Sequence, residues 1–335
     1  MLRLVVQRLL LLIPLLLGLS VLLFAWVRAL PGGPVTSMLG ERYTPEAAAR
    51  IEAEMGLDQP VWVQYGKYLA RLIEGDLGTS LRTGRPVLEE FLTRFPATIE
   101  LTLVALVLAI GIGIPLGYVA ARRAGSVVDH ASVVVSLIGV TVPVFFLAFI
   151  LKYLFAVELD WFPSAGRQSV TMVATHPTNF YVLDGLLTAE WDAAWDAMMH
   201  LVLPGLALSS IPLAIIARMT RAAVSEVQNA DYVRTARAKG IKASRLRSDH
   251  IIRNAMLPVL TTIGLQVGLL LSGAVLTETV FAFSGIGGFL AEAVFSADYP
   301  VLQGFVLLIA VVYALVNLIV DVSYGLIDPR LRRQQ

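Results

Sequence analysis

The chain has 335 residues, of which 57% are hydrophobic and 15% are charged, and its formal net charge is +1. This apolar excess over ordinary soluble domains predicts a protein embedded in lipid. A charge so close to zero argues against a nucleic-acid-binding protein, and the absence of cysteine excludes disulfides, thiolate catalysis and cysteine-ligated metals.

Six stretches are long and apolar enough to span a bilayer as helices, which takes roughly 20 residues. They are residues 9–30, 99–121, 131–157, 199–217, 257–279 and 301–323. The first is long for a secretory signal, and Arg28–Pro31 shows no small-x-small cleavage pattern, so we interpret it as a retained helix. The sequence therefore predicts an all-α polytopic membrane protein with about six transmembrane helices.

The distribution of Lys and Arg predicts the orientation, because short basic loops stay in the cytoplasm. Basic residues precede the first span, follow the second and sixth, and fill the segment between the fourth and fifth: Arg3, Arg8, Arg122, Arg123, Arg218, Arg221, Arg234, Arg237, Lys239, Lys242, Arg245, Arg247, Arg253, Arg330, Arg332 and Arg333. The other loops carry acids: Glu158, Asp160, Asp184, Glu190, Asp192, Asp196, Glu292 and Asp298. Both termini are therefore predicted to be cytoplasmic, as in a multi-pass protein of the cell inner membrane.

Two long segments are predicted to lie outside the membrane. Residues 31–98 contain helical stretches at Pro45–Met55 and Val61–Ile73, and they form either a covering or docking surface or a passive cap on the bundle. A later outer loop carries Trp191 and Trp195, which share one helical face. Such aromatic side chains favour either a place at the membrane–water interface or a role in substrate entry.

The basic segment between the fourth and fifth spans has the pattern of a short helix. Asp231 is placed to cap its start, residues 232–239 favour the helix, and Gly240 suits the left-handed residue that ends it. Ser244 is placed to cap a second helix, with Pro258 near the start of the fifth span. Because so short a helix is marginal in water, it persists only when packed, for example on a partner protein. The alternative is a solvated basic loop.

This segment resembles the coupling loop of peptide-type permeases of ATP-binding-cassette importers. The resemblance rests on Asp231–Gly240, which reads DYVRTARAKG, and on Arg253–Pro258, which reads RNAMLP. In that family the short helix docks in a groove of the ATPase subunit. The resemblance implies these ATPase-coupling residues: Asp231, Tyr232, Arg234, Thr235, Ala236, Arg237, Lys239 and Gly240. The general family signature begins Glu-Ala-Ala where this chain has Arg234, Thr235 and Ala236, and the spacing from Gly240 to Pro258 is longer here than in that signature. Both departures are those of the peptide and nickel branch.

Further motifs extend the resemblance along nearly the whole chain. They are Gly56–Pro60 (GLDQP), Gly75–Ser80 (GDLGTS), Thr277–Phe281 (TETVF), Asp298–Pro300 (DYP) and Asp328–Arg332 (DPRLR). The aromatic-rich outer loop followed by Ile211–Arg221 is similar to the B-type permeases of dipeptide systems. One departure is Phe283–Gly287, where relatives often have Trp-Pro-Gly, and it implies a local change in the outer turn.

The sequence contains no recognisable ATP-binding loop, so the energy for transport is predicted to come from a separate subunit or from an ion gradient. The only Gly-Lys pair, Gly66–Lys67, lacks the rest of the loop that cradles ATP phosphates. A gradient-driven secondary transporter is an alternative, but such proteins commonly carry ionisable residues at mid-membrane depth. Here Lys152, Glu278 and Asp321 are predicted near helix ends, and Glu100 at a helix entrance. An intramembrane enzyme would need paired catalytic acids or a metal site, and the four histidines lack metal-site spacing.

The second and fifth spans carry small residues at the spacing that lets helices approach closely. The pairs Gly113/Gly117 and Gly264/Gly268 serve packing either within the subunit or at an interface with a second permease that lines the pathway. Pro115 and Pro143 can kink their helices. The uncharged polar residues of the fifth span are candidates for contact with a peptide backbone: Thr261, Thr262, Gln266 and Ser272.

The resemblance implies a type I importer permease fold. Its parts would be a first transmembrane helix at 1–30, an extracytoplasmic segment at 31–98, a type-1 transmembrane domain at 99–325 with the coupling loop at 218–256, and a cytoplasmic tail at 326–335. The implied partners are a homologous second permease, two ATPase subunits that bind ATP and Mg, and an extracytoplasmic peptide-binding protein; no cofactor is implied in this chain. The implied function is import of dipeptides or short peptides rather than an enzymatic reaction, with glutathione and nickel complexes as alternative substrates.

Overall fold

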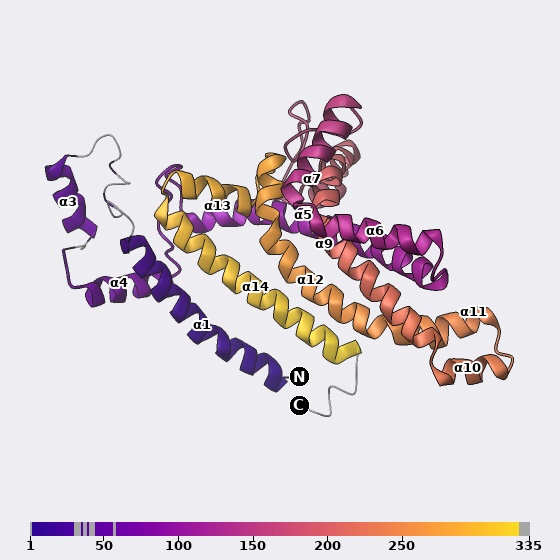
Figure 1. Ribbon diagram of the computed structural model, residues 1–335. Helices are drawn as coiled ribbons and strands as arrows, with labels where there is room; N and C mark the ends of the chain where they lie inside the picture. Colours follow the sequence, from indigo (N-terminus) through magenta and orange to yellow (C-terminus); the bar gives the residue numbers. More distant parts are fainter. Residues whose placement is uncertain (1, 30–34, 36–38, 40–43, 56–57, 328–335) are drawn as a thin grey trace. The chain divides into compact units, whose positions relative to one another are not determined.

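The computed structural model describes residues 2–29, 35, 39, 44–55 and 58–327, and their regular elements are helices (Figure 1). The α-helices are α1 (Leu2–Ala29), α3 (Pro45–Met55), α4 (Val61–Ile73), α5 (Val87–Arg122), α6 (Val127–Thr141), α7 (Val144–Leu151), α8 (Tyr181–Leu187), α9 (Trp191–Gln228), α10 (Asp231–Ala238), α11 (Ala243–Arg245), α12 (Arg253–Val280), α13 (Ile286–Phe295) and α14 (Tyr299–Ile327). Two π-helical stretches, η2 (Lys152–Glu158) and η3 (Leu246–Ile252), continue α7 and α11. The motif at 328–332, its basic residues, the tail beyond it and Gly56–Leu57 lie outside the described residues.

Within the described chain, five helices are long and apolar enough to cross a membrane, and the number is six when the bent pair of α6 with α7 and η2 is counted as one broken span. This confirms the prediction of about six spans. The predicted continuous span at 131–157 is wrong, because the helix breaks with a bend of 106°. Pro143 explains the break: it lacks the N–H needed to continue α6, and the preceding Val142 is extended (φ −75°, ψ 124°).

Several helices extend beyond their predicted ends. α5 begins at Val87 rather than near 99, and α9 covers Trp191–Gln228 rather than 199–217. Hydropathy detects only the apolar part of a helix, whereas the polar turns at its ends continue the same backbone ladder. α3 and α4 have the predicted bounds. α8 and α13 were not predicted, because seven and ten residues are too few for a clear periodic signal.

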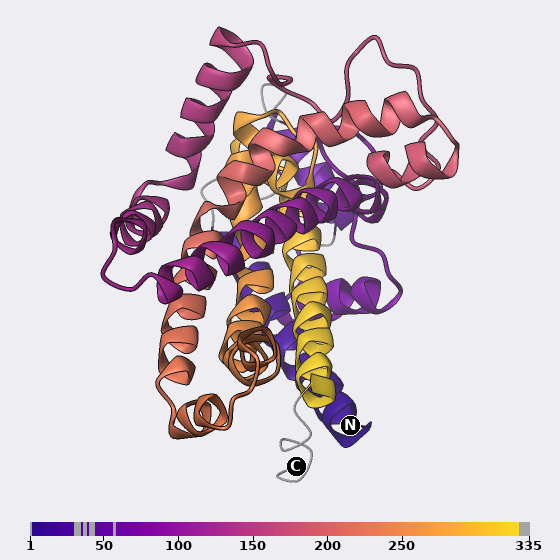
Figure 2. The same cartoon turned by 90° about the vertical axis from the view of Figure 1, so that its right-hand side faces the viewer.

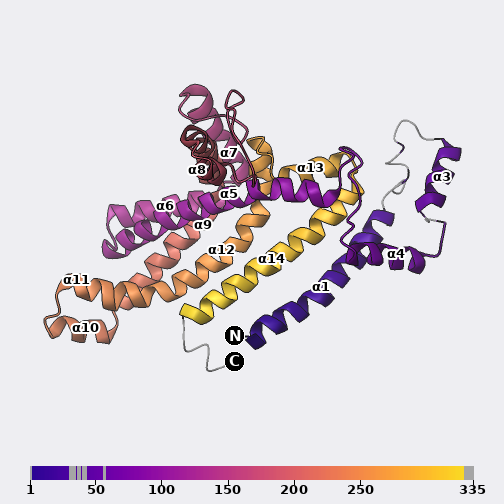
Figure 3. The same ribbon diagram turned by 180° about the vertical axis from the view of Figure 1, so that it is seen from behind.

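The chain forms two compact units, Met1–Phe95 with Phe289–Gln335 and Pro96–Gly288. In the first unit α1 and α14 pack side by side in opposite directions (Figure 3), and Gln303 Nε2 donates to Leu23 O at 3.2 Å. The start of α1 and the end of α14 therefore lie at the same end of this pair. The side of the membrane that this end faces stays a prediction.

Two of the sequence motifs meet in the first unit. Asp298 Oδ2 accepts hydrogen bonds from Ser80 Oγ at 2.6 Å and from the Arg82 N–H at 3.2 Å. Asp298 is buried and directly precedes α14, where a carboxylate is favourable beside the free N–H groups of the first turn. The motifs Gly75–Ser80 and Asp298–Pro300 are thus one structural feature, which fixes the start of α14.

In the second unit α9 packs against α6, α7, α8 and α12 (Figure 2). It also contacts α5 through glycines: a Cβ added to Gly117 would lie 2.3 Å from Ala217 O, and one added to Gly113 would lie 3.0 Å from Leu213 O. Of the two roles predicted for this glycine pair, the structure shows packing within the subunit. Gly264 and Gly268 are buried in α12.

Two of the predicted basic regions lie at one end of the second unit. α5 and α9 run in the same direction, so the turn after α5 lies beside the segment that follows α9. Asp129, at the start of α6, joins them by an ion pair with Arg221 of α9 (Nε–Oδ1 2.5 Å, Nη2–Oδ2 2.9 Å). Asp129 also accepts from the Gly125 N–H at 2.9 Å. Arg122, Arg123 and the segment after α9 therefore share one side.

We expect Gly117→Leu to disrupt the packing of α5 on α9. Its Cβ would lie 2.3 Å from Ala217 O and 2.8 Å from Thr220 Cβ, so the two helices would have to separate. Overpacking of this kind costs about 1–3 kcal/mol or more, and the thermal unfolding midpoint in detergent measures it. Gly111→Leu is the matched control, because nothing lies within 4 Å of its added Cβ. A wild-type midpoint for Gly117→Leu would contradict the described contact.

Candidate functional site

The predicted coupling segment forms the short helix α10, which lies with α11 at one end of α9 and α12 (Figure 1). It covers Asp231–Ala238, close to the predicted 232–239. Gly240 has φ +75°, and the N–H groups of Gly240 and Ile241 donate to the carbonyls of Arg237 (3.0 Å) and Ala236 (3.3 Å). This bond pair is the Schellman arrangement, so Gly240 ends the helix as predicted.

The predicted caps of the two helices are wrong. The residue before α10 is Ala230, and Asp231 is its first helical residue, with a side chain 98% exposed and no cap bond from Ala230. The N–H of Val233 is satisfied instead by the Ala230 carbonyl at 3.0 Å. Ser244 lies inside α11, which begins at Ala243. α11, η3 and α12 are continuous, so Pro258 lies within a long helical stretch rather than at its start.

One face of α10 is fixed by its own chain. Val233 is fully buried and Ala236 is 7% exposed. Both belong to an apolar cluster that we call the α10 seat, formed with residues of α5, α9, η3 and α12: Ala109, Ala121, Ile216, Ala223, Val224, Leu246, Ile251, Ala255 and Val259. The short helix is therefore held by burial within this subunit, and no partner is needed to explain its order.

The other face of α10 is exposed and basic. Arg234, Thr235, Arg237, Lys239 and Gly240 are exposed, with the Arg234 side chain at 70%. Tyr232 is 45% exposed, and its hydroxyl accepts a bond from Asn254 Nδ2 at 3.3 Å. Of the eight predicted coupling residues, only Ala236 points into the subunit. The exposed face of α10 is therefore mainly cationic.

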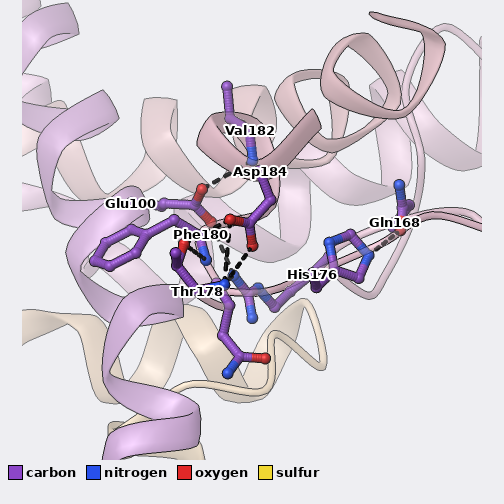
Figure 4. Close-up of polar contacts among 9 residues, drawn as sticks. Glu100, Gln168, His176, Thr178, Phe180, Val182 and Asp184 are labelled. Atoms are coloured by element: carbon purple, nitrogen blue, oxygen red, sulfur yellow. Dashed lines mark hydrogen bonds and ion pairs between the residues drawn. The ribbon is translucent and has the colours of Figure 1, made fainter. Parts of the chain in front are cut away.

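A buried ion pair organises the opposite end of the second unit. Arg167 Nη2 donates to Glu100 Oε2 at 2.8 Å and to Asn179 O at 2.6 Å, and both charged side chains are under 10% exposed. Glu100 Oε1 accepts from the Val182 N–H at 2.9 Å (Figure 4). Because α5 begins at Val87, Glu100 lies well inside the helix and not at its entrance as predicted. The pair pins the loop between η2 and α9 to α5.

The same loop has a second layer of contacts. The Tyr181 ring stacks on His176 at 3.6 Å, and the Arg167 guanidinium lies 3.7 Å from the centre of the Tyr181 ring. The buried Asp184 accepts from Thr178 Oγ1 at 2.6 Å, and this bond lies beside Glu100 in Figure 4. Sequence reasoning missed this cluster. The available signal was Arg167 itself, because it is the only Lys or Arg between Lys152 and Arg218 and stands in an acidic loop.

Glu278 ties three helices together at this end. It is 1% exposed, accepts from Thr98 Oγ1 of α5 at 2.6 Å, and accepts from the Gly288 N–H in the first turn of α13 at 2.8 Å. It lies two residues before the end of α12, near a helix end as predicted. Lys152 Nζ donates to Val280 O at 2.8 Å and so satisfies a terminal carbonyl of α12. The side chain of Asp321 lies outside the described residues.

The three pathway candidates whose side chains the structure describes do not form one surface. Thr262 and Gln266 are 7% and 4% exposed on the face of α12 that packs within the unit, whereas Thr261 is exposed. Thr262 Oγ1 donates to Pro258 O at 2.9 Å. The side chain of Ser272 lies outside the described residues. Among the side chains that the structure describes, no three His, Cys, Asp or Glu gather as they would around a metal ion.

Comparison with known proteins gives consistent matches over the whole chain. The family model described as binding-protein-dependent transport system inner membrane component matches residues 113–333, and its N-terminal companion matches residues 1–102. The chain is 45% identical over 332 residues to the dipeptide transport system permease protein DppB of Alkalihalophilus pseudofirmus, covering 99% of this chain and 100% of that one. It is 48% identical to the di/tripeptide transport system permease protein DppB of Pseudomonas aeruginosa, with complete coverage of both.

A solved structure supports the fold alone. A chain of the MetNI methionine ABC transporter, in an inward-facing conformation, aligns with a TM-score of 0.53. The alignment covers 72% of the present chain and 98% of that chain, at 16% sequence identity. The two chains therefore share the helical arrangement of an importer permease.

Proposed function

Because the chain belongs to the family of binding-protein-dependent transport system inner membrane components, we propose that it is a permease subunit that carries dipeptides into the cell. It is a multi-pass protein of the inner membrane. The dipeptide assignment is supported by full-length relatives at 45% and 48% identity whose names specify dipeptides or di/tripeptides. Glutathione and nickel complexes are the competing substrates, and competition for labelled dipeptide uptake distinguishes them.

The proposal depends mainly on one observation about α10: one face of this helix is buried in its own subunit, and the other face is exposed and basic. A binding-protein-dependent system implies ATPase and binding-protein partners. We assign the exposed residues Tyr232, Arg234 and Arg237 to contact with the ATPase, at the cytoplasmic end of the second unit. ATP binding then moves α10, and α10 moves the spans that hold it. Such coupling requires ATP and substrate each to bind the inward- and outward-open states with different affinity.

The rest of the assembly completes the proposal. A homologous second permease shares the pathway, two ATPase subunits bind ATP and Mg below it, and an extracytoplasmic protein delivers the peptide from the opposite side. Both termini of this chain are assigned to the cytoplasm, on the basic residues of the loops. On this orientation the Glu100–Arg167 loop faces the delivering protein, and the α10 end faces the ATPases.

We expect the double variant Arg234→Glu/Arg237→Glu to lower ATP-dependent dipeptide uptake at least tenfold in vesicles that contain the assembled transporter. On the proposed contact, the two reversed charges would be repelled by the ATPase surface that binds the native arginines. A tenfold loss corresponds to about 1.4 kcal/mol. The buried face of α10 is untouched, so membrane insertion and thermal stability should remain. ATPase co-purification with the permease measures the contact directly.

The matched control is Arg122→Glu/Arg123→Glu, which reverses two exposed charges at the same end of the second unit but outside α10. This variant should retain most uptake and ATPase binding. Undiminished uptake by the α10 double variant would refute the coupling role. Uptake that is insensitive to vanadate but abolished by ionophores would indicate a gradient-driven transporter instead.

A further inference from the structure

Helix α4 packs across the last turns of α1, within the first unit (Figure 3). Ser20 Oγ and Tyr65 OH lie 3.0 Å apart, and the ring centres of Phe24 and Tyr65 are 5.2 Å apart. Nearer the end of α1, Arg28 Nη2 donates to Gln64 Oε1 at 2.6 Å. The contacts thus run from Ser20 to Arg28 along α1.

These contacts set the depth of α4. α1 is a candidate membrane span over Val5–Ala29. Ser20 lies nine residues before Ala29, which is about 14 Å along the helix at 1.5 Å per residue. The headgroup layer on one side of a bilayer is only about 5–8 Å thick, by the difference between total and hydrocarbon thickness. α4 therefore lies at the level of the headgroups and the first part of the acyl chains.

The surface of α4 that α1 leaves uncovered has two different edges. Trp62 and Ile73 are 75% and 80% exposed and lie three helical turns apart, on one apolar edge. Lys67 and Arg71 are exposed one turn apart, on a cationic edge. At 3.6 residues per turn the two edges are about 150° apart around the helix axis.

The orientation of α4 on α1 decides which edge lies deeper in the membrane. Tyr65 stands on the side of the packed face next to the apolar edge, and it reaches the deeper residue Ser20. Gln64 stands on the side next to the cationic edge, and it reaches Arg28 near the end of the span. The apolar edge of α4 therefore faces the membrane interior, and the cationic edge faces outward.

The surface of α1 that α4 leaves uncovered at this level is apolar and open as well. Val21, Leu22 and Trp26 are 50%, 62% and 41% exposed at the same level of the span as the α4 contacts. At 3.6 residues per turn Leu22 and Trp26 lie on the side of α1 away from α4, so apolar surface is open at this depth where α4 does not cover the span. Lipid rather than a soluble protein partner is therefore the occupant that fits both the depth and the charge pattern.

We propose that α4 is an interfacial membrane helix that inserts Trp62 and Ile73 among the acyl chains and places Lys67 and Arg71 at lipid phosphates. Its partner is the bilayer surface, with anionic lipid favoured by the two cations. The helix fixes the depth and tilt of α1, because interfacial aromatic and basic residues anchor a span. The predicted cap or docking segment at 31–98 thus includes a membrane anchor.

The absence of cysteine in this chain makes a direct test simple. Single variants Trp62→Cys, Ile73→Cys, Lys67→Cys and Arg71→Cys carry a nitroxide label in the assembled transporter, with partner cysteines replaced, in vesicles of phosphatidylethanolamine and phosphatidylglycerol. We expect labels at 62 and 73 to collide several-fold more with oxygen than with a water-soluble nickel chelate, as a Leu22→Cys control does. Labels at 67 and 71 should show the reverse preference, as a label at the exposed Thr83 does.

Equal exposure of all four labels to the water-soluble chelate would overturn the proposal. Protection of positions 62 and 73 that develops only when the extracytoplasmic binding protein is added would overturn it too, because the apolar edge would then dock a protein. The four side chains are exposed, so their replacement leaves the helix packing intact. Uptake need not change, and the outcome is thus independent of the proposed substrate.

Discussion

Replacing Gly240 by proline is expected to abolish ATP-driven uptake while the chain still inserts into the membrane. Gly240 has φ +75°, whereas proline is fixed near −65°. Proline would also remove the N–H that donates to Arg237 O at 3.0 Å. The end of α10 would unwind, at a cost of about 3 kcal/mol or more, and its exposed face would no longer be presented in one orientation. Vesicle uptake of labelled dipeptide and ATPase co-purification measure the two consequences.

The control for this variant stands two residues further along the chain. Lys242 has φ −53°, close to the value that proline requires, so Lys242→Pro should retain most uptake. If Gly240→Pro transports at the wild-type rate, α10 is not the coupling element. A charge at Ala236 would answer a different question, because this side chain is buried in the α10 seat and its replacement would loosen the helix from its own subunit.

The second large effect is expected at the buried ion pair. Arg167→Met would leave the Glu100 carboxylate without its cation in a site where both side chains are under 10% exposed. Removing one partner of a buried pair typically costs about 3–5 kcal/mol. We therefore expect a clear fall in the thermal unfolding midpoint and increased proteolysis of the loop between η2 and α9. Arg82→Met is the control, because its ion pair with Glu292 is exposed (43% and 59%) and is worth at most about 1 kcal/mol.

A second substitution should rescue this variant. In Arg167→Met/Glu100→Gln no uncompensated charge remains, and the amide oxygen can still accept the Val182 N–H. The double variant should regain most of the lost stability. If Arg167→Met alone leaves the unfolding midpoint unchanged, or if the double variant is as unstable as the single one, the ion pair does not hold this loop.

The spans were predictable from sequence because lipid imposes two strong requirements on them. A helix must satisfy its own backbone groups and present apolar side chains over about 20 residues, and both demands are visible in the composition of each stretch. The break at Pro143 was only half predictable: proline signals a kink, but the bend of 106° depends on the packing of both halves. α8 and α13 are too short to give a signal of their own.

The contacts between distant residues were beyond a single sequence. Thr98 and Glu278 are 180 residues apart, and Ser80 and Asp298 are 218 apart, so no local pattern pairs them. Gly240 was predictable because a left-handed residue after a helix is a local requirement. The caps were not predictable, because an acidic residue such as Asp231 is also favourable inside the first turn of a helix, and the backbone carbonyls of Ala230 and Lys242 already close the first turns.

The α10 seat has a mechanical consequence. Val233 and Ala236 share this apolar cluster with residues of α5, α9, η3 and α12, and α10 packs directly against η3, which continues into α12. Close-packed protein interiors transmit displacement and do not absorb it. If α10 is the coupling element, as proposed, its displacement would be passed first to η3 and α12. The far ends of α5 and α12 are joined by the hydrogen bond from Thr98 Oγ1 to Glu278, so on the proposed coupling a movement of α12 would also reach α5 at the opposite end of the second unit.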